Sequence, residues 1–358
     1  MIDILRSIVQ MRRLAVSFIS ALASALTLCA HAGMVTGVIT SAALSGNLLG
    51  DPDTRELALY LPPSYHAGDI RYPVVHYLHG YTGDHNMWIN FGIEDAMDEL
   101  IQNGSVQEMI VVLPNAFNSH LGSFYASSSV TGDYETYMTE EVVDFVDSNY
   151  RTIPQRESRA IGGGSMEGQG AATLAFSRPD VYSGMVSHSG AVSIARFLGR
   201  LNSTGELWRD GPLWRGTFIA QSLAFSPNPD TPDLYDYPLD DSGALRDDVW
   251  QRWLEHDPVT MVDTRPDLVR QLQGIYFDHG TADTIVDVEQ SRDLATALDR
   301  SGIPYTYEED TGDHYSHWPQ RLHTALPFLS DLLANEIATP VAPRGKLTTT
   351  WASVKSGM

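Results

Sequence analysis

Three residues of the types used in nucleophilic catalysis follow three different apolar segments of the chain: Ser165, Asp283 and His314. A serine hydroxyl is a poor nucleophile until a base, usually a histidine, accepts its proton. The histidine in turn needs a carboxylate to orient it, and the oxyanion that forms needs N–H donors. The three residue types together therefore predict chemistry at an activated serine.

Ser165 lies in the glycine-rich stretch 158–170, between a predicted strand that ends near Ile161 and a predicted helix that begins at Met166. A sharp strand-to-helix turn lifts a serine Oγ above the sheet edge, and the free N–H groups of the helix start favour an anion. The usual pattern is Gly-x-Ser-x-Gly, and Glu167 departs from it. Pointing inward, its carboxylate would oppose an oxyanion; pointing to solvent, it would have little effect. The alternative is an inert serine at an ordinary junction.

The partners of Ser165 have competitors of the same residue type nearby. Asp278 and Asp287 flank Asp283, and the glycine-containing turn directly before Asp283 favours that residue. His317 follows His314 by three residues, and the Gly-Asp-His turn favours His314. The two histidines have the spacing of a metal pair, but no third ligand is evident, so we predict no metal site and no cofactor.

Further residues are expected to complete the site. The oxyanion hole is expected to use the backbone N–H groups of Met166 and of Tyr81, which follows the bend at Gly80. Aromatic and imidazole side chains are expected to contact the substrate, and these are Trp88, Phe124, Tyr125 and His188.

The elements that must position these residues alternate between strands and helices. Apolar runs predict strands over 33–49, 55–61, 72–78, 109–113, 159–161, 182–186, 273–277 and 305–308. Helical periodicity predicts helices over 93–101, 138–149, 166–176, 288–298 and 322–333, the last with a kink at Pro327. Such alternation is typical of a mainly parallel α/β sheet with helices on both faces. In these sheets ligands bind at the carboxyl ends of the strands, where His79, Ser165 and His188 all fall.

Residues 191–265 interrupt this rhythm and hold four of the seven tryptophans. We interpret the segment as an insertion packed over the site; the alternative is that its aromatic residues form a small core of their own. Its acidic loop, 230–241, has oxygen ligands suited to Ca²⁺, although a solvated loop is the commoner use of such a segment. Residues 337–358 are expected to form a disordered tail.

The first 32 residues have the composition of a secretory signal. Arg12 and Arg13 precede an apolar run over 14–30, and Ala30-His31-Ala32 fits a small-x-small cleavage site. We expect cleavage after Ala32 and a secreted or periplasmic protein with one catalytic domain over 33–336.

Composition narrows the chemistry and the partners. Cys29 is the single cysteine and lies in the predicted signal, so the mature chain would have no disulfide and no thiol nucleophile. The formal net charge of −22 disfavours nucleic acid and anionic membrane surfaces as partners.

Several short blocks between about residues 50 and 335 resemble the "Putative esterase" family of α/β-hydrolases. That family includes esterase D-like S-formylglutathione hydrolases, feruloyl and acetyl-xylan esterases, enterochelin esterases and mycolyltransferases. The matching blocks are 60–65, 71–80, 122–125, 149–152, 156–160 with Ser165-Met166, 280–283 and 312–314. The resemblance implies an α/β-hydrolase fold and a catalytic triad of Ser165, Asp283 and His314. Glu167 departs from it, because the family usually has Gly or Ala there.

Together these observations predict a secreted serine carboxylesterase that forms an acyl-enzyme on Ser165. The aromatic insertion suggests apolar or aromatic esters, such as phenolic or feruloyl-like esters, either as small molecules or attached to a polymer. Predicted export disfavours S-formylglutathione hydrolysis. Two alternatives stay open: acyl transfer to a sugar or lipid alcohol, and a hydrolase-fold binding protein that has lost catalysis.

Overall fold

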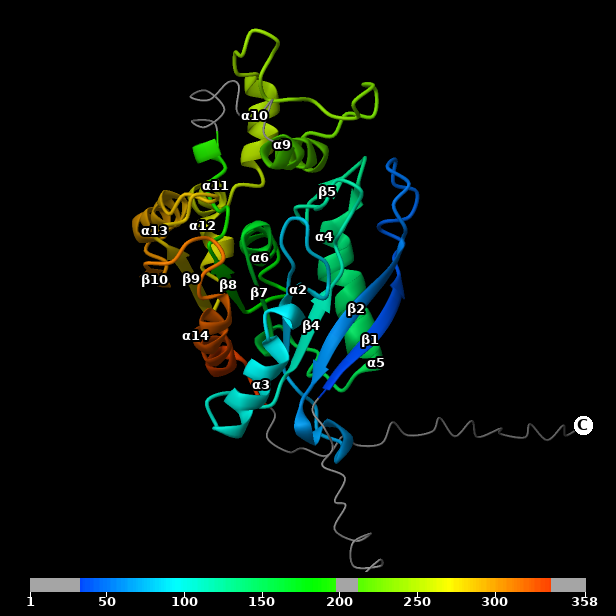
Figure 1. Ribbon diagram of the computed structural model, residues 1–358, viewed down its shortest axis with the longest axis vertical. Coiled ribbons are helices and arrows are strands. Elements are labelled where there is room, and N and C mark those ends of the chain that lie inside the picture. The colour runs from blue at the N-terminus through cyan, green and yellow to red at the C-terminus, as the bar shows by residue number, and fades with distance from the viewer. Residues whose placement is uncertain (1–32, 198–211, 336–358) are drawn as a thin grey trace, which may run out of the picture.

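The structure is a computed structural model that describes residues 33–197 and 212–335, and its centre is one large sheet (Figure 1). In this part of the chain the sheet has eight strands in the order β1-β2-β4-β3-β7-β8-β9-β10. The strands are β1 (Gly33–Thr40), β2 (Thr54–Leu61), β3 (Val74–Tyr77), β4 (Ile110–Pro114), β7 (Arg159–Gly164), β8 (Gly184–His188), β9 (Gly274–Gly280) and β10 (Thr306–Asp310). A separate two-stranded ladder pairs β5 (Ser127–Ser128) with β6 (Gly132–Asp133).

The sheet is parallel except at one edge. β1 pairs antiparallel with β2, and β2 pairs antiparallel with β4. The pairs from β4 through β3, β7, β8 and β9 to β10 are all parallel. β3, β4, β7 and β8 are buried along their whole length, as expected for strands covered on both faces. The predicted mainly parallel α/β sheet is confirmed.

Two layers of helices cover the sheet. The helices are α2 (Met87–Asn90), α3 (Ile93–Gln102), α4 (Tyr134–Thr136), α5 (Val142–Asn149), α6 (Met166–Ser177), α9 (Pro212–Phe225), α10 (Asp247–Leu254), α11 (Pro258–Thr264), α12 (Pro266–Val269), α13 (Glu289–Ser301) and α14 (Trp318–Leu332). A π-helical turn, Tyr137–Glu141, joins α4 to α5. The apolar faces of α3 and α14 share one core with the sheet, and those of α5, α6, α11 and α13 share the other. Each layer buries the apolar stripe that the sequence periodicity predicts.

The predicted elements differ from the observed ones mainly at their ends. The strand predicted over 33–49 stops at Thr40, and the chain turns directly after it, where the N–H of Ser45 donates to the carbonyl of Ala42 over 3.2 Å. The last helix starts earlier than predicted, at Trp318, where Pro319 suits the first turn.

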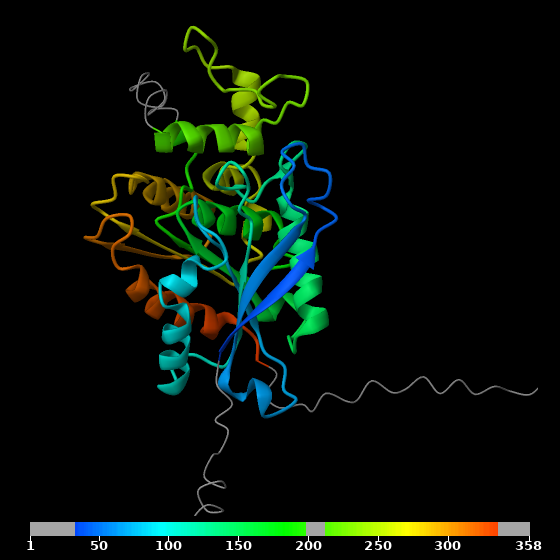
Figure 2. The same ribbon diagram turned by 45° about the vertical axis from the view of Figure 1, so that its right-hand side comes forward.

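The segment predicted as an insertion contributes α9 and α10, which lie beyond the end of the sheet (Figures 1 and 2). Trp253 is the centre of its packing. The ring of Trp253 lies 6.5 Å from that of Phe218, 5.7 Å from that of Phe225 and 6.0 Å from that of Trp250. These aromatic residues pack on one another, and Phe225 also packs on Phe124, 5.6 Å away between ring centroids, so the insertion contacts the rest of the domain as well. Trp208 lies outside the described residues.

The two ends of this insertion are joined by hydrogen bonds. The N–H of Ile194 donates to Oδ1 of Asp257 over 2.8 Å, and the N–H of Val259 donates to the carbonyl of Val192 over 3.3 Å. Asp257 also caps α11 by accepting from the N–H of Thr260. The chain therefore leaves the sheet after β8 and returns to it at nearly the same place.

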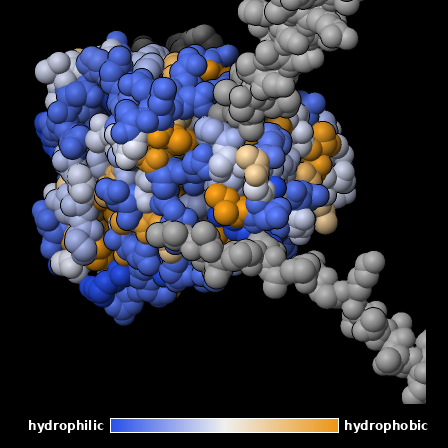
Figure 3. Space-filling view, turned by 90° about the horizontal axis from the view of Figure 1, so that it is seen from below, coloured by the Kyte–Doolittle hydropathy of each residue, from blue (hydrophilic) through white to orange (hydrophobic). Residues whose placement is uncertain are grey.

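The predicted signal, residues 1–32, and the predicted tail, 337–358, both lie outside the residues that the structure describes. Within the described ranges, no helix has both the length and the apolarity to cross a membrane. The face of the molecule shown in Figure 3 is mostly hydrophilic, with small and separate hydrophobic patches.

Candidate active site

Ser165 occupies a strained turn between β7 and α6. Its φ of 62° and ψ of −122° place a non-glycine residue in a region that L-amino acids rarely adopt. The end of β8 holds the turn from both sides, because the N–H of Ser165 donates to the carbonyl of His188 (2.8 Å) and the N–H of Ala191 donates to the carbonyl of Ser165 (3.2 Å). Gly168 lets α6 approach this strand end, since a Cβ there would lie 2.6 Å from Oγ of Ser187. The turn has the geometry of a nucleophile elbow.

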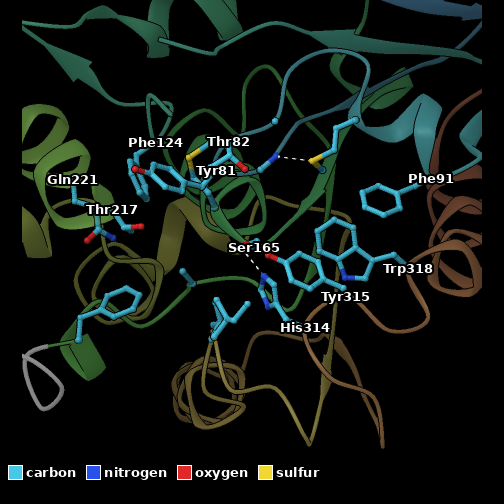
Figure 4. A pocket seen from close by; sticks show the side chains of 18 residues that line it. Tyr81, Thr82, Phe91, Phe124, Ser165, Thr217, Gln221, His314, Tyr315 and Trp318 are labelled. Atoms are coloured by element: carbon cyan, nitrogen blue, oxygen red, sulfur yellow. Dashed lines mark hydrogen bonds between the residues drawn. The ribbon is translucent and has the colours of Figure 1, made fainter. Parts of the chain in front are cut away.

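The structure brings Ser165, His314 and Asp283 into one hydrogen-bonded line. Oγ of Ser165 lies 2.9 Å from Nε2 of His314 (Figure 4). Nδ1 of His314 lies 2.6 Å from Oδ2 of Asp283. The competitors bind elsewhere: Asp278 accepts from His188 over 2.6 Å, and His317 lies 3.3 Å from Asp310. The line has the arrangement needed for a base to take the serine proton.

Asp283 is held as an acceptor by several donors. The N–H groups of Ile285 and Val286 donate to its Oδ1 over 2.8 and 2.9 Å. Burial acts to raise its pKa, but hydrogen bonds from His279 and His314 outweigh burial and hold the pKa of Asp283 below its usual range. The carboxylate therefore stays ionised and keeps His314 oriented.

The loops that carry Asp283 and His314 touch backbone to backbone. A Cβ at Gly280 would lie 2.3 Å from the carbonyl oxygen of Gly312, so neither loop has room for a side chain at this contact. The close approach of the two glycine turns sets the distance between the carboxylate and the imidazole.

The turn expected to supply one oxyanion donor is braced from below. The hydroxyl of Tyr125 donates to the carbonyl of His79 (2.7 Å), and Nε2 of His79 accepts from the N–H of Ala116 (2.8 Å). Nδ1 of His79 lies 3.1 Å from the carbonyl of Gly80. Burial lowers the pKa of His79 to about 4, so the ring is neutral and can accept from Ala116.

Tyr81 and Met166 follow this turn and the elbow, respectively, and both line the cavity above Ser165. Within the described ranges, neither backbone N–H donates to another backbone carbonyl, whereas the N–H groups of Thr82 and Gly83 do. The two groups are therefore available to a ligand oxygen.

Glu167 points inward. It is fully buried, and neither carboxyl oxygen has a hydrogen-bond partner among the described residues. A Cβ at Gly80 would lie 2.6 Å from its Oε2, and a Cβ at Gly163 would lie 2.3 Å from its Cγ, so the side chain fills the space that two glycines leave. Burial raises the pKa of Glu167 well above its usual range, which favours the neutral carboxyl over the carboxylate.

His188 belongs to a buried polar network beneath the elbow. Its Nε2 lies 2.6 Å from the hydroxyl of Tyr77, and its Nδ1 lies 2.6 Å from Asp278. Arg321 lies 3.3 Å from Asp278 and donates to Ser189 over 2.8 Å. The network fixes the end of β8, to which the Ser165 turn is hydrogen-bonded.

A cavity of about 340 Å³ opens above Ser165, at the lower end of the size range of small-molecule sites. Most of its wall is apolar or aromatic, and the aromatic lining residues are Tyr81, Phe91, Phe124, Phe197, Tyr315 and Trp318. Figure 4 shows Phe124 and Tyr81 on one side of Ser165, and Trp318 and Tyr315 on the other.

The predicted substrate contacts need correction. Phe124 lines the cavity, but Trp88, Tyr125 and His188 do not. Trp88 is buried beneath it, stacked on Trp318 at 5.2 Å between ring centroids. Tyr125 and His188 are occupied in bracing the two turns described above. Their aromatic or imidazole character indicated a pocket wall, but sequence position cannot show that a side chain points beneath the wall instead of into the space.

Several cavity residues were not predicted from the sequence, among them Tyr315, Trp318, Phe197, Thr217 and Gln221. The first two follow His314 closely, so their place at the end of the same strand–loop unit was a usable signal. Thr217 and Gln221 come from α9, and only the folded insertion places them. Of the insertion's aromatic residues that the structure describes, Phe197 alone reaches the cavity.

No metal centre is evident in the described ranges, where no group of three or more His, Cys, Asp and Glu side chains could hold an ion. In the acidic loop, Asp236 pairs with Arg252 over 2.7 Å and with Arg246 over 3.4 Å. Asp240 accepts from Ser242 and from the N–H of Ala244. These two carboxylates are occupied by the protein itself.

Known proteins resemble this chain over most of the described region. A family model described as "Putative esterase" matches residues 52–329. An esterase of Mycobacterium tuberculosis is 29% identical over 145 residues, which are 39% of this chain and 30% of that protein. An acetyl esterase of Caldicellulosiruptor saccharolyticus is 22% identical over 255 residues, which are 71% of this chain and 81% of that protein.

Solved structures share the fold. A ferulic acid esterase superposes with a TM-score of 0.63 at 24% sequence identity, over 85% of this chain and 99% of that one. The likeness shows the α/β-hydrolase fold. The mycobacterial match spans only 30% of the length of its relative, so it describes one part of that protein.

Proposed function

The chain belongs to the "Putative esterase" family, and on that premise we propose that it is a serine carboxylesterase that forms an acyl-enzyme on Ser165. Family membership supports carboxylic-ester hydrolysis. The observation that carries the mechanism is the line of hydrogen bonds from Ser165 through His314 to Asp283 at the floor of a cavity.

In the first half-reaction, Oγ of Ser165 attacks the ester carbonyl carbon and its proton moves to Nε2 of His314. The carbonyl oxygen becomes an oxyanion, which accepts from the N–H groups of Tyr81 and Met166. Collapse of this intermediate breaks the bond to the alcohol oxygen, which leaves with the proton from His314. In the second half, a water gives a proton to His314 and attacks the acyl carbon. The bond from that carbon to Oγ of Ser165 then breaks, Oγ takes the proton back from His314, and the acid is released.

Asp283 supports both halves without changing its charge. Its low pKa keeps it ionised beside the imidazolium that forms on His314, and its hydrogen bond fixes the ring tautomer. Burial favours the neutral form of Glu167, and a neutral side chain does not oppose the oxyanion despite its place next to Met166. The departure from the usual elbow pattern is therefore compatible with catalysis.

The cavity supports esters with an apolar or aromatic part. Its aromatic rings come from turns and loops around the sheet and only in one case, Phe197, from the described part of the insertion. The preference for phenolic esters thus rests on Tyr81, Phe124 and Trp318, whereas Trp250 and Trp253 of the insertion do not line the cavity. A volume of about 340 Å³ admits one ring-sized group beside the reacting ester.

The test is removal of the nucleophile. Changing Ser165→Ala is expected to lower kcat on a reactive aryl ester by about 10⁶-fold and to abolish labelling by a fluorophosphonate probe. Peptide mapping of the labelled wild type should place the probe on Ser165.

Ser187→Ala is the matched control, because Ser187 is buried beside the elbow, lacks a hydrogen-bond partner for its Oγ among the described residues, and does not line the cavity. Turnover should persist in that variant. Ester hydrolysis that survives in Ser165→Ala would reject the proposed nucleophile, and product formed only with an added alcohol would indicate acyl transfer instead of hydrolysis.

We also propose that residues 1–32 direct export and are removed after Ala32, on the strength of the charged start, apolar run and small-x-small site. Intact mass and N-terminal sequencing of protein from cell fractions test this. A mature chain beginning at Gly33 outside the cytoplasm is expected, and a full-length cytoplasmic protein would contradict it.

A further inference from the structure

Gln221 is a buried amide without a hydrogen-bond partner in the part of the chain that the structure describes. It lies on α9, is 1% exposed and lines the cavity above Ser165. Neither its Oε1 nor its Nε2 has a hydrogen-bond partner among the described residues. Leaving a buried donor or acceptor unpaired costs roughly 1–3 kcal/mol, so a folded protein seldom keeps a whole amide in that state without use.

The surroundings of Gln221 offer it no protein partner in the described part of the chain. Thr217 is one helical turn away on the same face of α9, and its side chain is already hydrogen-bonded to Tyr81. Phe124 and Phe197 contribute aromatic surface to the same cavity. Figure 4 shows Gln221 beside Thr217, on the opposite side of Ser165 from Trp318 and Tyr315.

We propose that Gln221 is a specificity-determining residue that hydrogen-bonds a hydroxyl group on the ring-sized part of the ester substrate. A primary amide donates through Nε2 and accepts through Oε1, and a hydroxyl group is the small group that can do both in return. The ring that bears the hydroxyl packs on Phe124 and Phe197. This inference rests on the proposed esterase function and narrows its substrate to hydroxylated aromatic esters.

The chemistry of discrimination follows from the burial. A substrate with the hydroxyl satisfies the amide on binding, whereas the same ester without it covers the amide and leaves it unpaired. A site built to hydrogen-bond a hydroxyl rejects the analogue that lacks it much more strongly than an apolar pocket rejects an added hydroxyl. The hydroxylated ester is therefore expected to have the higher kcat/KM by about 10- to 100-fold.

The experiment compares matched pairs of esters on wild type and on Gln221→Leu. One pair varies the acyl half (methyl 4-hydroxycinnamate and methyl cinnamate), and the other varies the alcohol half (2-(4-hydroxyphenyl)ethyl acetate and 2-phenylethyl acetate). Wild type should prefer the hydroxylated member of at least one pair. In Gln221→Leu that preference should fall to within about threefold of unity, because an apolar side chain leaves no amide to satisfy.

Gln169→Leu is the matched control. Gln169 is also a buried glutamine whose Oε1 has no partner among the described residues, but it does not line the cavity. Its loss should leave the hydroxyl preference of the enzyme unchanged, even if both rates fall. A general loss of stability would likewise lower the kcat/KM of both members of a pair and leave the ratio of the two values unchanged.

Binding without turnover gives a second readout. In the Ser165→Ala background, calorimetry should show tighter binding of the hydroxylated ester, and the difference should vanish when Gln221→Leu is added. Two results would overturn the inference and leave the esterase function standing. One is equal kcat/KM for both members of both pairs in wild type. The other is a hydroxyl preference that survives Gln221→Leu, which would mean that Gln221 binds only water. A wild type that cleaves no ester and takes no fluorophosphonate would overturn the proposed function itself.

Discussion

Glu167 shows how one residue can break a sequence pattern and still fit the chemistry around it. A glutamate directly after an oxyanion donor is unfavourable if it carries charge, and burial without a partner removes that charge. The neutral side chain fills the space beside Gly80 and Gly163. The sequence identified this residue as anomalous, but only the packing shows that it faces inward.

The first prediction concerns Glu167→Gln, which keeps the shape of the side chain and removes its titration. Above pH 4.5 the unfolded chain releases the Glu167 proton while the folded chain keeps it, so the wild type loses stability as pH rises towards the folded-state pKa. Relative to the wild type, we expect the free energy of unfolding of the variant to increase by up to about 1.4 kcal/mol per pH unit in that pH range. Urea unfolding from pH 4.5 to 9 measures this difference.

An exposed glutamate provides the control for this measurement. Glu255→Gln makes the same chemical change on the surface. A pH dependence common to both variants, or none in Glu167→Gln, would show that burial of Glu167 does not hold its proton.

At the scale of elements, the site is assembled from turns that touch through glycines. The turn at Gly80 packs on the side chain of Glu167 from α6, and the turn at Gly280 packs on the backbone of Gly312. The first contact can yield because its partner is the end of a flexible side chain, whereas the second cannot. The two contacts should therefore respond differently to an added methyl group.

The second prediction uses that difference in a double-mutant cycle. Gly80→Ala should lower the free energy of unfolding by about 1–3 kcal/mol through contact with Glu167, and Glu167→Gly should remove most of that cost. Gly280→Ala, whose Cβ would lie 2.3 Å from a backbone oxygen, should cost the same with or without Glu167→Gly. Additive effects of Gly80→Ala and Glu167→Gly would contradict the packing described.

The strands and helices and their order were largely predictable from the sequence. The direction in which individual side chains point was not. Hydrophobic periodicity indicated the strands and helices, and chain order placed Ser165, Asp283 and His314 at the ends of three different strands, where the structure brings them together. Tyr125 and His188 were predicted in the pocket and lie beneath it. Gln221 had no local signal, because its position depends on how α9 packs beyond the strand ends above Ser165 (Figure 1).

On the scale of the whole molecule, buried neutral histidines make the fold sensitive to acid. Burial lowers the pKa of His76 to about 3 and that of His79 and His256 to about 4, from 6.5 in the unfolded chain. As pH falls from 6.5 towards 4, these histidines take up protons in the unfolded chain but stay neutral in the folded chain, so the free energy of unfolding decreases. Asp257, whose pKa burial raises to about 6, acts in the opposite sense, as do Glu167 and Glu135, whose pKa values burial also raises, so these carboxyl groups offset part of the loss.

The third prediction is a loss of several kcal/mol in the free energy of unfolding between pH 6.5 and 4, measured by urea unfolding. Replacing one of the three, His256→Gln, should make the dependence shallower by up to about 1.4 kcal/mol per pH unit in this range. Stability that is flat across this range, or equally steep in the variant, would mean that these rings are protonated in the folded protein.

The hydrogen bonds that join Ile194 to Asp257 and Val259 to Val192 close the base of the insertion. A segment that leaves and re-enters a scaffold at one point can be lengthened, exchanged or lost during evolution without moving the strands on which Ser165, Asp283 and His314 depend. Because Gln221 is carried on that segment, substrate choice can be inherited separately from the reaction itself. Transplanting residues 195–256 between related enzymes would then carry the preference for one ester over another into an unchanged catalytic frame.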